Sequence, residues 1–289
     1  MAHHDRHSAT GAGTFDIGGD LTVNRLGFGA MRLTGSRLWG DPAGPEGPGR
    51  RVLRRALELD VNFIDTADFY GPELNETLIR ETLHPYPEDL LIATKGGAVL
   101  RGPGDWSPDG RPEHLREACE ASMKRLGVER IDLYQFHVPD PKVPYEESIG
   151  ALADLRDEGK VRHVGISNVN PEQLETAQSI VPIASVQNRY NIAQRDANVL
   201  VDACERAGIA FLPYRPLATG DLSGPGGPIP EIAARHDATE EQVALAWLLH
   251  RSPFIVPIPG TSSVAHLEAN VAAADISFDK TEMATLDAA

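Results

Sequence analysis

Eight short apolar runs, each followed by a helix-like segment, constrain the fold of this chain more than any other feature. The runs are nearly continuous rather than alternating, which is typical of parallel strands covered by helices. The expected strands are Leu26–Ala30, Val61–Asp65, Leu90–Lys95, Ile131–His137, Val161–Ser167, Ser185–Asn188, Ile209–Tyr214 and Phe254–Ile258. Eight strand–helix units with right-handed crossovers predict an α/β fold, a single (β/α)8 TIM barrel.

The segments between these strands are expected to be helices. They are Gly49–Leu59, Leu74–Leu83, Pro112–Leu126, Tyr145–Glu158, Pro171–Ser179, Arg195–Ala207, Ile229–His236 and Val264–Ala273, with an extra helix at Thr239–His250. Two helix starts carry capping signals. Asn170 precedes Pro171, and Thr239 stands three residues before Gln242, the spacing of a capping box.

The N-terminal part precedes the first strand–helix unit. Residues 1–12 are expected to be a flexible N-terminus and residues 13–289 to form one barrel domain. Thr14–Ile17 and Leu21–Asn24 flank a Gly-Gly-Asp turn, which predicts a hairpin across the N-terminal bottom of the barrel. Three long loops rich in Gly and Pro follow strands, and we expect them at the opposite face: Leu33–Pro48, Arg101–Gly110 and Thr219–Pro228.

Charge and cysteine content exclude several classes of protein. The 289 residues carry a formal net charge of −15, which argues against a nucleic-acid or anionic-membrane partner. Cys119 and Cys204 are too few for a disulfide framework and suit a reducing compartment. No apolar run is long enough for a transmembrane helix, and no signal-like N-terminus is evident. We therefore expect a cytoplasmic protein, a monomer or weak homo-oligomer, that acts on a small molecule.

Four groups that can carry or influence a proton fall at or just after the ends of expected strands. Asp65 ends the second strand, Tyr70 follows in the next loop, Lys95 ends the third strand and His137 ends the fourth. All strand C-termini of such a barrel open onto one face, so these side chains should converge there. No strand end carries a His-x-His pair or clustered carboxylates, so we expect no metal.

At this point the chain resembles the aldo-keto reductases over nearly its whole length. The motifs that carry the resemblance are Asn62–Gly71, Ala93–Lys95, Ile131–His137, Val164–Asn168, Val186–Asn191 and Ile258–Thr261. Within the family it is similar to the bacterial pyridoxal reductases, through Asn24–Met31 and Ala244–Leu267. The resemblance implies NAD(P)H-dependent reduction of an aldehyde or ketone to an alcohol.

The chemistry explains why the four residue types are needed. Hydride addition to a carbonyl carbon leaves an alkoxide, which must take up a proton, and the resemblance gives the role of donor to Tyr70. A phenol is a poor acid–base catalyst at neutral pH, so Lys95 is expected to lower its pKa. Asp65 would keep Lys95 charged and oriented. His137 would hydrogen-bond the carbonyl oxygen and polarise it.

The resemblance also implies a nicotinamide site. Ser167, Asn168 and Gln187 would bind the carboxamide, and Tyr214 would stack on the nicotinamide ring. The other cofactor residues that it implies are Gly29, Met31, Arg215, Pro216, Leu217, Gly220, Ile258, Gly260, Thr261, Ser262, Ser263, His266 and Asn270. The family usually has a serine at the place of Arg215, so the role of this arginine stays open. No Gly-x-Gly-x-x-Gly opens a βαβ unit, so the site is not of the Rossmann type.

The expected site for the adenosine 2′-phosphate departs from the family pattern. Many members place a lysine and an arginine where this chain has Gly260 and His266. Hydroxyl groups, His266 and the N-terminus of the following helix remain as contacts. We expect NADPH to be preferred, with NADH possible.

Several functions remain open. The pocket should be lined by Met31, Trp39 and Trp106, which suits a flat ring such as that of pyridoxal. A broad-specificity aldehyde reductase with an unrelated natural substrate is equally compatible. A barrel aldolase that forms a Schiff base on Lys95 is a second class. A nicotinamide-binding regulatory subunit is a third, because such barrels retain the cofactor site.

Overall fold

The computed structural model describes residues 7–34, 47–102, 104–217 and 227–288. Within these residues a curled parallel sheet of seven strands runs in the order β11-β10-β9-β8-β5-β4-β3. Its strands are β3 (Phe28–Gly29), β4 (Phe63–Asp65), β5 (Leu91–Gly96), β8 (Ile131–Phe136), β9 (Val161–Ser167), β10 (Ile183–Gln187) and β11 (Ala210–Phe211). Because all neighbours are parallel, the C-terminal ends of the strands lie on one side of the sheet.

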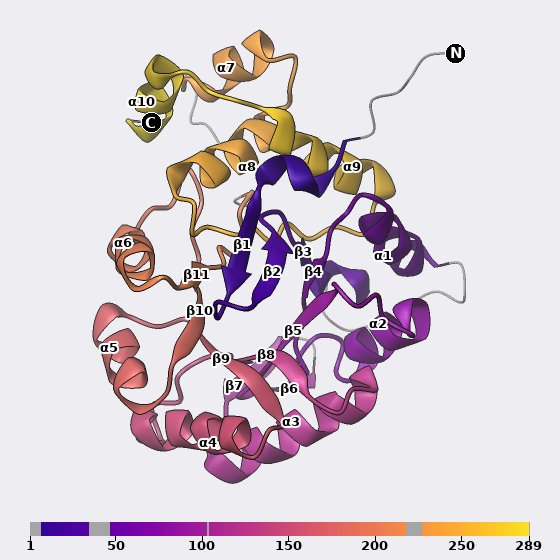
Figure 1. Cartoon of the computed structure of the whole chain (residues 1–289), viewed down its shortest axis with the longest axis vertical. Helices are drawn as coiled ribbons and strands as arrows, with labels where there is room; N and C mark the ends of the chain where they lie inside the picture. The colour runs from indigo at the N-terminus through magenta and orange to yellow at the C-terminus, as the bar shows by residue number, and fades with distance from the viewer. Residues whose placement is uncertain (1–6, 35–46, 103, 218–226, 289) are drawn as a thin grey trace.

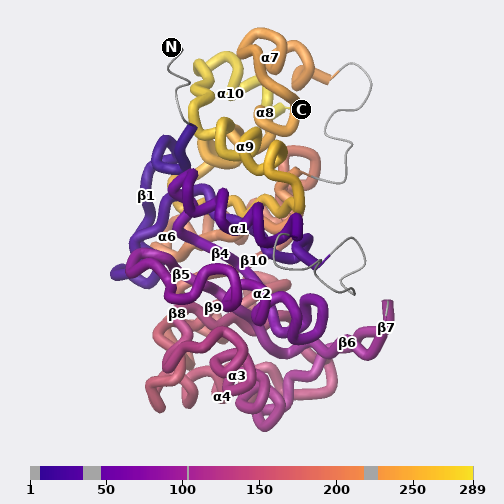
Figure 2. The backbone as a smooth tube through the Cα atoms, turned by 90° about the vertical axis from the view of Figure 1, so that its right-hand side faces the viewer, coloured from indigo at the N-terminus to yellow at the C-terminus, as the bar shows by residue number. Residues whose placement is uncertain are grey.

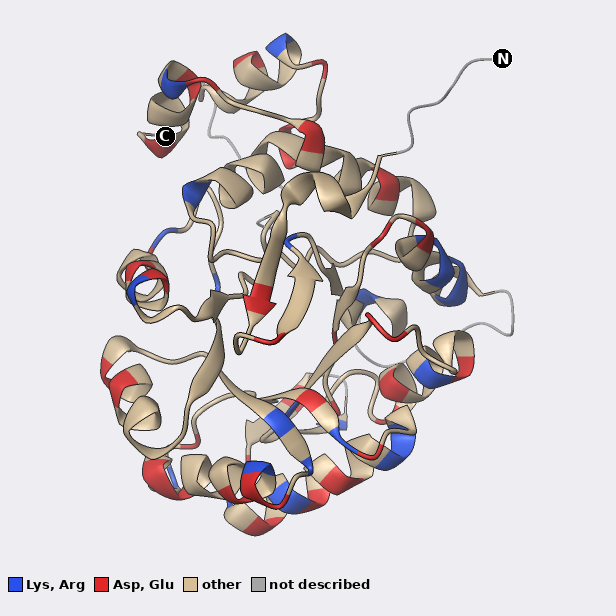
Figure 3. Ribbon diagram, viewed as in Figure 1, with Lys and Arg blue, Asp and Glu red and all other residues tan. Residues whose placement is uncertain are grey.

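The helices surround this sheet (Figure 1). They are α1 (Pro48–Glu58), α2 (Leu74–Leu83), α3 (Pro112–Leu126), α4 (Tyr145–Asp157), α5 (Pro171–Ile180), α6 (Asn198–Ala207), α7 (Ile229–Arg235), α8 (Glu240–Arg251), α9 (Val264–Ala272) and α10 (Lys280–Asp287). Short 3₁₀ helices are η1 (Ala9–Ala12), η2 (Ala30–Thr34) and η3 (Ala273–Asp275). Charged side chains lie mainly on the outer helices, whereas the strands are mostly uncharged (Figure 3). Apolar strands inside charged helices account for the sequence pattern.

The expected hairpin is present: β1 (Thr14–Ile17) pairs antiparallel with β2 (Leu21–Asn24), and Ile17 lies opposite Leu21. Ile17 and Val23 are fully buried and cluster with interior residues of the sheet such as Phe63. The side-chain oxygen of Asn62, just before β4, accepts a hydrogen bond from the backbone N–H of Asn24 at 2.8 Å. The hairpin therefore contacts the side of the sheet on which the strands begin. Figure 2 shows the backbone of the chain from a second direction.

The expected eighth strand, Phe254–Ile258, is not a strand in the structure. This segment still bonds to both edges of the sheet: Val256 donates to the carbonyl of Phe211, and Gly27 donates to that of Pro257, each at 2.9 Å. Pro257 and Pro259 have no N–H to donate, so a regular ladder cannot form. The edge strands β11 and β3 are thus linked through an irregular extended segment.

Other differences concern the connections. The expected loop Arg101–Gly110 contains most of an antiparallel hairpin, β6 (Ala98–Gly102) and β7 (Asp105–Pro108). The Gly and Pro residues in this segment predicted a loop rather than strands. Helix α10 was not expected at all. Residues 9–12 of the expected flexible N-terminus form η1, in which Ala9 and Ala12 are buried; residues 1–6 lie outside the described part.

Most helices match their expected bounds to within one residue, and both capping signals are confirmed. Asn170 and Thr239 each accept a hydrogen bond from the backbone of the glutamine three residues on, which returns one to the cap. The start of α6 is later than expected, at Asn198 rather than Arg195, because residues 191–194 form a bonded turn first.

Candidate active site

The four expected catalytic residues lie together at the C-terminal side of the sheet. Asp65 ends β4, Lys95 is the second-last residue of β5, and His137 directly follows β8. Tyr70 lies in the turn before α2. Lys95 is completely buried, and Asp65 and Tyr70 are exposed by 2% and 7%. A buried charge needs a partner, and the arrangement of these residues provides one.

The ammonium group of Lys95 is the centre of the cluster. Its Nζ lies 2.6 Å from Oδ2 of Asp65 and donates to the carbonyl of Thr66 at 2.8 Å. A third contact joins Nζ to the phenol oxygen of Tyr70 at 3.4 Å. These three acceptors use the full donor capacity of an ammonium group.

Burial alone would lower the pKa of Lys95, but the Asp65 carboxylate and the Tyr70 phenol together raise it. As expected, the charge of Lys95 acts to lower the pKa of Tyr70. Burial raises the pKa of Tyr70, and the opposing effect of Lys95 does not overcome it. The physical reason is that the Lys95 charge is already paired with Asp65, while its contact with the phenol is long.

Two glutamines complete the environment of Asp65. Nε2 of Gln135 and Nε2 of Gln187 donate to Oδ1 of Asp65 at 3.0 and 2.8 Å. Both are buried, on β8 and β10. From the sequence, Gln187 was expected to bind the cofactor only, and Gln135 was not expected in the site. Its place two residues before His137 was the available signal, since alternate residues of a strand share a face.

The imidazole of His137 is neutral. Burial, together with the nearby Lys95 charge, lowers its pKa to about 3. Its Nδ1 atom is buried and has no hydrogen-bond partner in the described part of the chain. The ring stands nearly perpendicular to that of Tyr70, with 6.0 Å between centroids. A neutral imidazole beside a phenol can donate a hydrogen bond to a carbonyl oxygen.

Aromatic rings extend outward from this pair. Phe69 makes edge-to-face contacts with His137 at 5.5 Å and with Trp106 at 6.0 Å between centroids. Trp106, on β7, is half exposed. Met31 lies in η2, directly after β3, and is partly exposed. Trp39 lies outside the described residues. Phe69 was not among the expected pocket residues, although its position next to Tyr70 could have suggested it.

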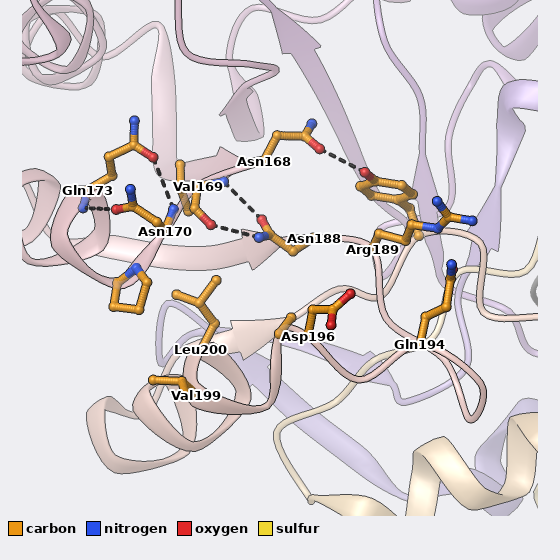
Figure 4. A pocket seen from close by; sticks show the side chains of 13 residues that line it. Asn168, Val169, Asn170, Gln173, Asn188, Arg189, Gln194, Asp196, Val199 and Leu200 are labelled. Carbon is orange, nitrogen blue, oxygen red and sulfur yellow. Dashed lines mark hydrogen bonds between the residues drawn. The ribbon is translucent and has the colours of Figure 1, made fainter.

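The expected nicotinamide residues also lie together. The hydroxyl of Tyr214 donates to Oδ1 of Asn168 at 2.8 Å (Figure 4). Nδ2 of Asn168 donates to the carbonyl of His137 at 2.9 Å and to Oγ of Ser167 at 3.1 Å. A pocket of about 510 Å³ opens beside Asn168 and Tyr214, between the loops that precede α5 and α6. Hydrogen bonds thus connect the expected stacking residue, Tyr214, through Asn168 to the backbone carbonyl of His137.

The remaining expected cofactor residues lie after β11, around Gly29 and Gly260, and at the start of α9. Arg215 is exposed, Pro216 is buried and Leu217 is partly buried, whereas Gly220 lies outside the described residues. Gly29 and Gly260 are so close that a Cβ on Gly260 would lie 2.6 Å from the Gly29 carbonyl oxygen, and one on Gly29 would lie 2.5 Å from that of Ile258.

The hydroxyl groups near α9 are partly used within their own loop. Oγ1 of Thr261 accepts from the N–H of Ser263 at 3.0 Å, and Oγ of Ser263 accepts from that of His266 at 3.4 Å. Ser262 and His266 are exposed, and Asn270 is buried on α9. This helix start still presents hydroxyls and an exposed imidazole without a fixed cation at positions 260–263.

With this geometry established, comparison with known proteins identifies the family. Residues 25–289 match the aldo/keto reductase family, and the chain belongs to it. An oxidoreductase of Schizosaccharomyces pombe is 47% identical over 279 residues, covering 96% of this chain and 90% of that protein. Pyridoxine 4-dehydrogenase of Escherichia coli is 44% identical over 280 residues, covering 95% and 97%.

Solved structures agree with this assignment. A thermostable aldo-keto reductase crystallised with the inhibitor epalrestat superposes with a TM-score of 0.84 at 32% identity, covering 95% of this chain and 98% of that one. An aldo-keto reductase of Klebsiella pneumoniae in complex with NADPH has a TM-score of 0.78 at 26% identity, covering 95% and 94%. The family assignment makes the chain an oxidoreductase of the carbonyl reductase class.

Metal-binding clusters and membrane-spanning helices were also sought among the described residues. In the described residues, no group of three or more His, Cys, Asp or Glu side chains could hold a metal ion. No helix among the same residues is long and apolar enough to cross a membrane.

Proposed function

We propose that this protein reduces an aldehyde or ketone carbonyl to an alcohol with a nicotinamide cofactor, NADPH in preference to NADH. The observation that carries the proposal is the position of Lys95, which contacts both Asp65 and the Tyr70 phenol beside the neutral His137. The fold that we propose for it is a closed (β/α)8-type barrel, in which the extended segment Phe254–Ile258 joins the edge strands β11 and β3 and the β1–β2 hairpin lies across the bottom.

Each catalytic group has one task in this proposal. When bound, the nicotinamide cofactor supplies the hydride. His137, as a neutral imidazole, hydrogen-bonds the substrate carbonyl oxygen and polarises it. Tyr70 gives its proton to that oxygen as the alkoxide forms, and Lys95 stabilises the resulting phenolate. Asp65 holds Lys95 charged and aimed at the phenol.

The unused hydrogen-bonding capacity at the end of β9 and β10 suits a carboxamide. Oδ1 of Asn168 accepts one bond from Tyr214 and can accept another, while the Ser167 hydroxyl remains able to donate. Nε2 of Gln187 is directed at Asp65, so its carbonyl oxygen remains as an acceptor. Two acceptors and one donor match the two N–H groups and one carbonyl of a primary carboxamide.

The aromatic wall favours a planar substrate. Phe69 and Trp106 extend the ring pair of Tyr70 and His137 toward solvent, and such surfaces bind flat rings. Pyridoxal, reduced to pyridoxine, is the substrate that we propose first, supported by the name of the E. coli relative. A broad-specificity reductase with a different natural aldehyde is the second candidate.

A Schiff-base aldolase is disfavoured by the same geometry. Its lysine must lose a proton to attack a carbonyl carbon. Here Asp65 and Tyr70 raise the pKa of Lys95 and keep it an ammonium. A purely regulatory nicotinamide-binding protein would differ from a reductase by having no turnover with any aldehyde.

Two measurements test the proposal. The first is kcat/KM for pyridoxal, nitrobenzaldehyde, methylglyoxal and a sugar aldehyde with each cofactor, because specificity is a ratio of these values. A pyridoxal value no higher than the others would remove the vitamin substrate but leave the reductase. The second is Tyr70→Phe, which should lose most of kcat and retain cofactor affinity. Unchanged turnover would refute the role of Tyr70.

A further inference from the structure

Two consecutive polar residues on the first turn of α2 are completely buried. Asn75 and Glu76 both have no exposed surface, although neither belongs to the proposed catalytic group. Buried glutamates are rare unless they are paired, so their contacts indicate what they do. Helix α2 lies in the outer layer between α1 and α3 (Figure 1).

Glu76 is bonded at both carboxylate oxygens. Its Oε1 accepts from the Thr94 hydroxyl at 2.6 Å, and its Oε2 accepts from Nε of Arg125, on α3, at 2.6 Å. Thr94 immediately precedes Lys95 on β5. Because side chains alternate along a strand, Thr94 points to the helices while Lys95 points into the sheet interior. The Glu76 contact therefore fixes the backbone from which Lys95 projects.

Asn75 makes the corresponding contact on the neighbouring strand. Its Oδ1 accepts from the Thr66 hydroxyl at 3.1 Å, and its Nδ2 donates to the carbonyl of Ala30 at 2.8 Å. Thr66 immediately follows Asp65, and its own carbonyl accepts from Lys95. One helical turn thus holds the chain next to both members of the buried ion pair.

We propose that the first turn of α2 positions the Asp65–Lys95 pair, with Glu76, acting through the Thr94 hydroxyl, as a positioning residue for the reaction. The inference rests on the proposed reductase function. It assigns Glu76 no contact with substrate or cofactor. Its effect is to hold Lys95 Nζ within reach of the Tyr70 phenol, where the present contact of 3.4 Å leaves little room for displacement.

The test uses Thr94→Val, which removes only the hydroxyl at nearly constant volume, and Thr94→Ser, which retains it. We expect Thr94→Val to lower kcat about tenfold with the KM for NADPH within about twofold, since small misplacements of catalytic groups are costly. Thr94→Ser should restore most of kcat. In a Lys95→Met background, Thr94→Val should cause no further loss, because the effect passes through Lys95. Glu76→Gln should give a loss in the same direction if it folds.

Ser252→Ala is the matched control, because the buried Ser252 hydroxyl also donates to a glutamate, Glu205, at 2.9 Å. It should change thermal stability but not kcat. Equal rates for the wild type and Thr94→Val, or an equal loss of rate in the Lys95→Met background, would overturn the inference. A crystal structure of Thr94→Val distinguishes failure of the positioning role from failure of the proposed reductase function. If the wild type reduces no aldehyde the function fails, whereas an unmoved Lys95–Asp65 pair in the variant refutes the positioning role whatever the activity.

Discussion

Nε2 of Gln187 lies 2.8 Å from Oδ1 of Asp65, so a residue expected to bind the cofactor also contacts the carboxylate that pairs with Lys95. Gln135, on β8, donates to the same oxygen at 3.0 Å; in the sheet, β9 lies between β8 and β10, the strand that carries Gln187. The two glutamines leave Oδ2 of Asp65 to Lys95. Under the proposed function, Gln187 links cofactor binding to the orientation of the ion pair, whereas no cofactor contact is proposed for Gln135.

This difference predicts distinct kinetics for two otherwise similar variants. Gln187→Leu should raise the KM for NADPH and lower kcat, each by about tenfold, because it loses a hydrogen bond to a charged group and a carboxamide contact. Gln135→Leu should lower kcat with little change in the KM for NADPH. Steady-state kinetics with a fixed aldehyde measure both. Identical effects of the two variants would contradict the link.

Much of the fold and of the catalytic group could be predicted because both depend on local patterns. Apolar runs determined the strands, and the strand ends determined where Asp65, Lys95 and His137 would meet. The pattern of Phe254–Ile258 reads as a strand, whereas in the structure this segment joins both edges of the sheet without a regular ladder, because Pro257 has no N–H to donate.

The contacts that the sequence did not indicate are those between elements. The burial of Glu76 depends on Thr94 and Arg125, which are 18 and 49 residues away along the chain. A glutamate on the first turn of a helix normally suggests an exposed residue that favours the helix dipole. The net pKa of Tyr70 could not be predicted for a related reason: its burial, which outweighs the lowering effect of Lys95, depends on the whole surrounding structure.

The neutral state of His137 should be visible in acid unfolding. Its pKa is lowered to about 3 in the folded protein, against an ordinary value near 6.5. Between these values the unfolded chain binds more protons, so this group reduces stability as pH falls below 6.5. His137→Gln should therefore lose about 2–3 kcal/mol less than the wild type between pH 7 and pH 4.5. Urea unfolding at the two pH values measures this, and parallel losses would contradict it.

Asp68 should have an effect of the opposite sign. Burial, reinforced by the charge of Glu76, raises its pKa to about 8, and its Oδ1 is buried without a partner among the described residues. The folded protein then binds more protons than the unfolded chain between pH 4 and pH 8, so stability falls as pH rises through this range. Asp68→Asn should become more stable relative to the wild type, by at least about 1 kcal/mol, between pH 5 and pH 8.

Urea unfolding at pH 5 and pH 8 measures this change, and Asp109→Asn provides the control. The hydrogen bond from Arg111 lowers the pKa of Asp109, so its contribution to stability is already complete above the unfolded value and should not change between pH 5 and pH 8. A wild-type curve that runs parallel to that of Asp68→Asn over this range would show that Asp68 is ionised in the folded protein.

The last prediction concerns the cofactor phosphate and the two positions that depart from the family pattern. Gly260 cannot take the lysine that the family resemblance led us to look for, because a Cβ there would lie 2.6 Å from the backbone carbonyl oxygen of Gly29. Gly260→Lys should lower stability by about 1–3 kcal/mol through overpacking. His266 is exposed on the first turn of α9, so His266→Arg should fold normally. Its fixed charge should increase the preference for NADPH over NADH by about three- to tenfold, since a guanidinium pairs well with phosphate.

Titration of each cofactor by quenching of protein fluorescence, together with thermal unfolding, measures both effects. His266→Ala serves as the opposite control and should weaken NADPH while leaving NADH nearly unchanged, because only NADPH carries the 2′-phosphate. If His266→Arg and His266→Ala bind the two cofactors in the same ratio as the wild type, this helix start does not contact the 2′-phosphate. The preference would then have to come from another part of the chain, and the assignment of Ser262, Ser263 and His266 to that phosphate would be wrong.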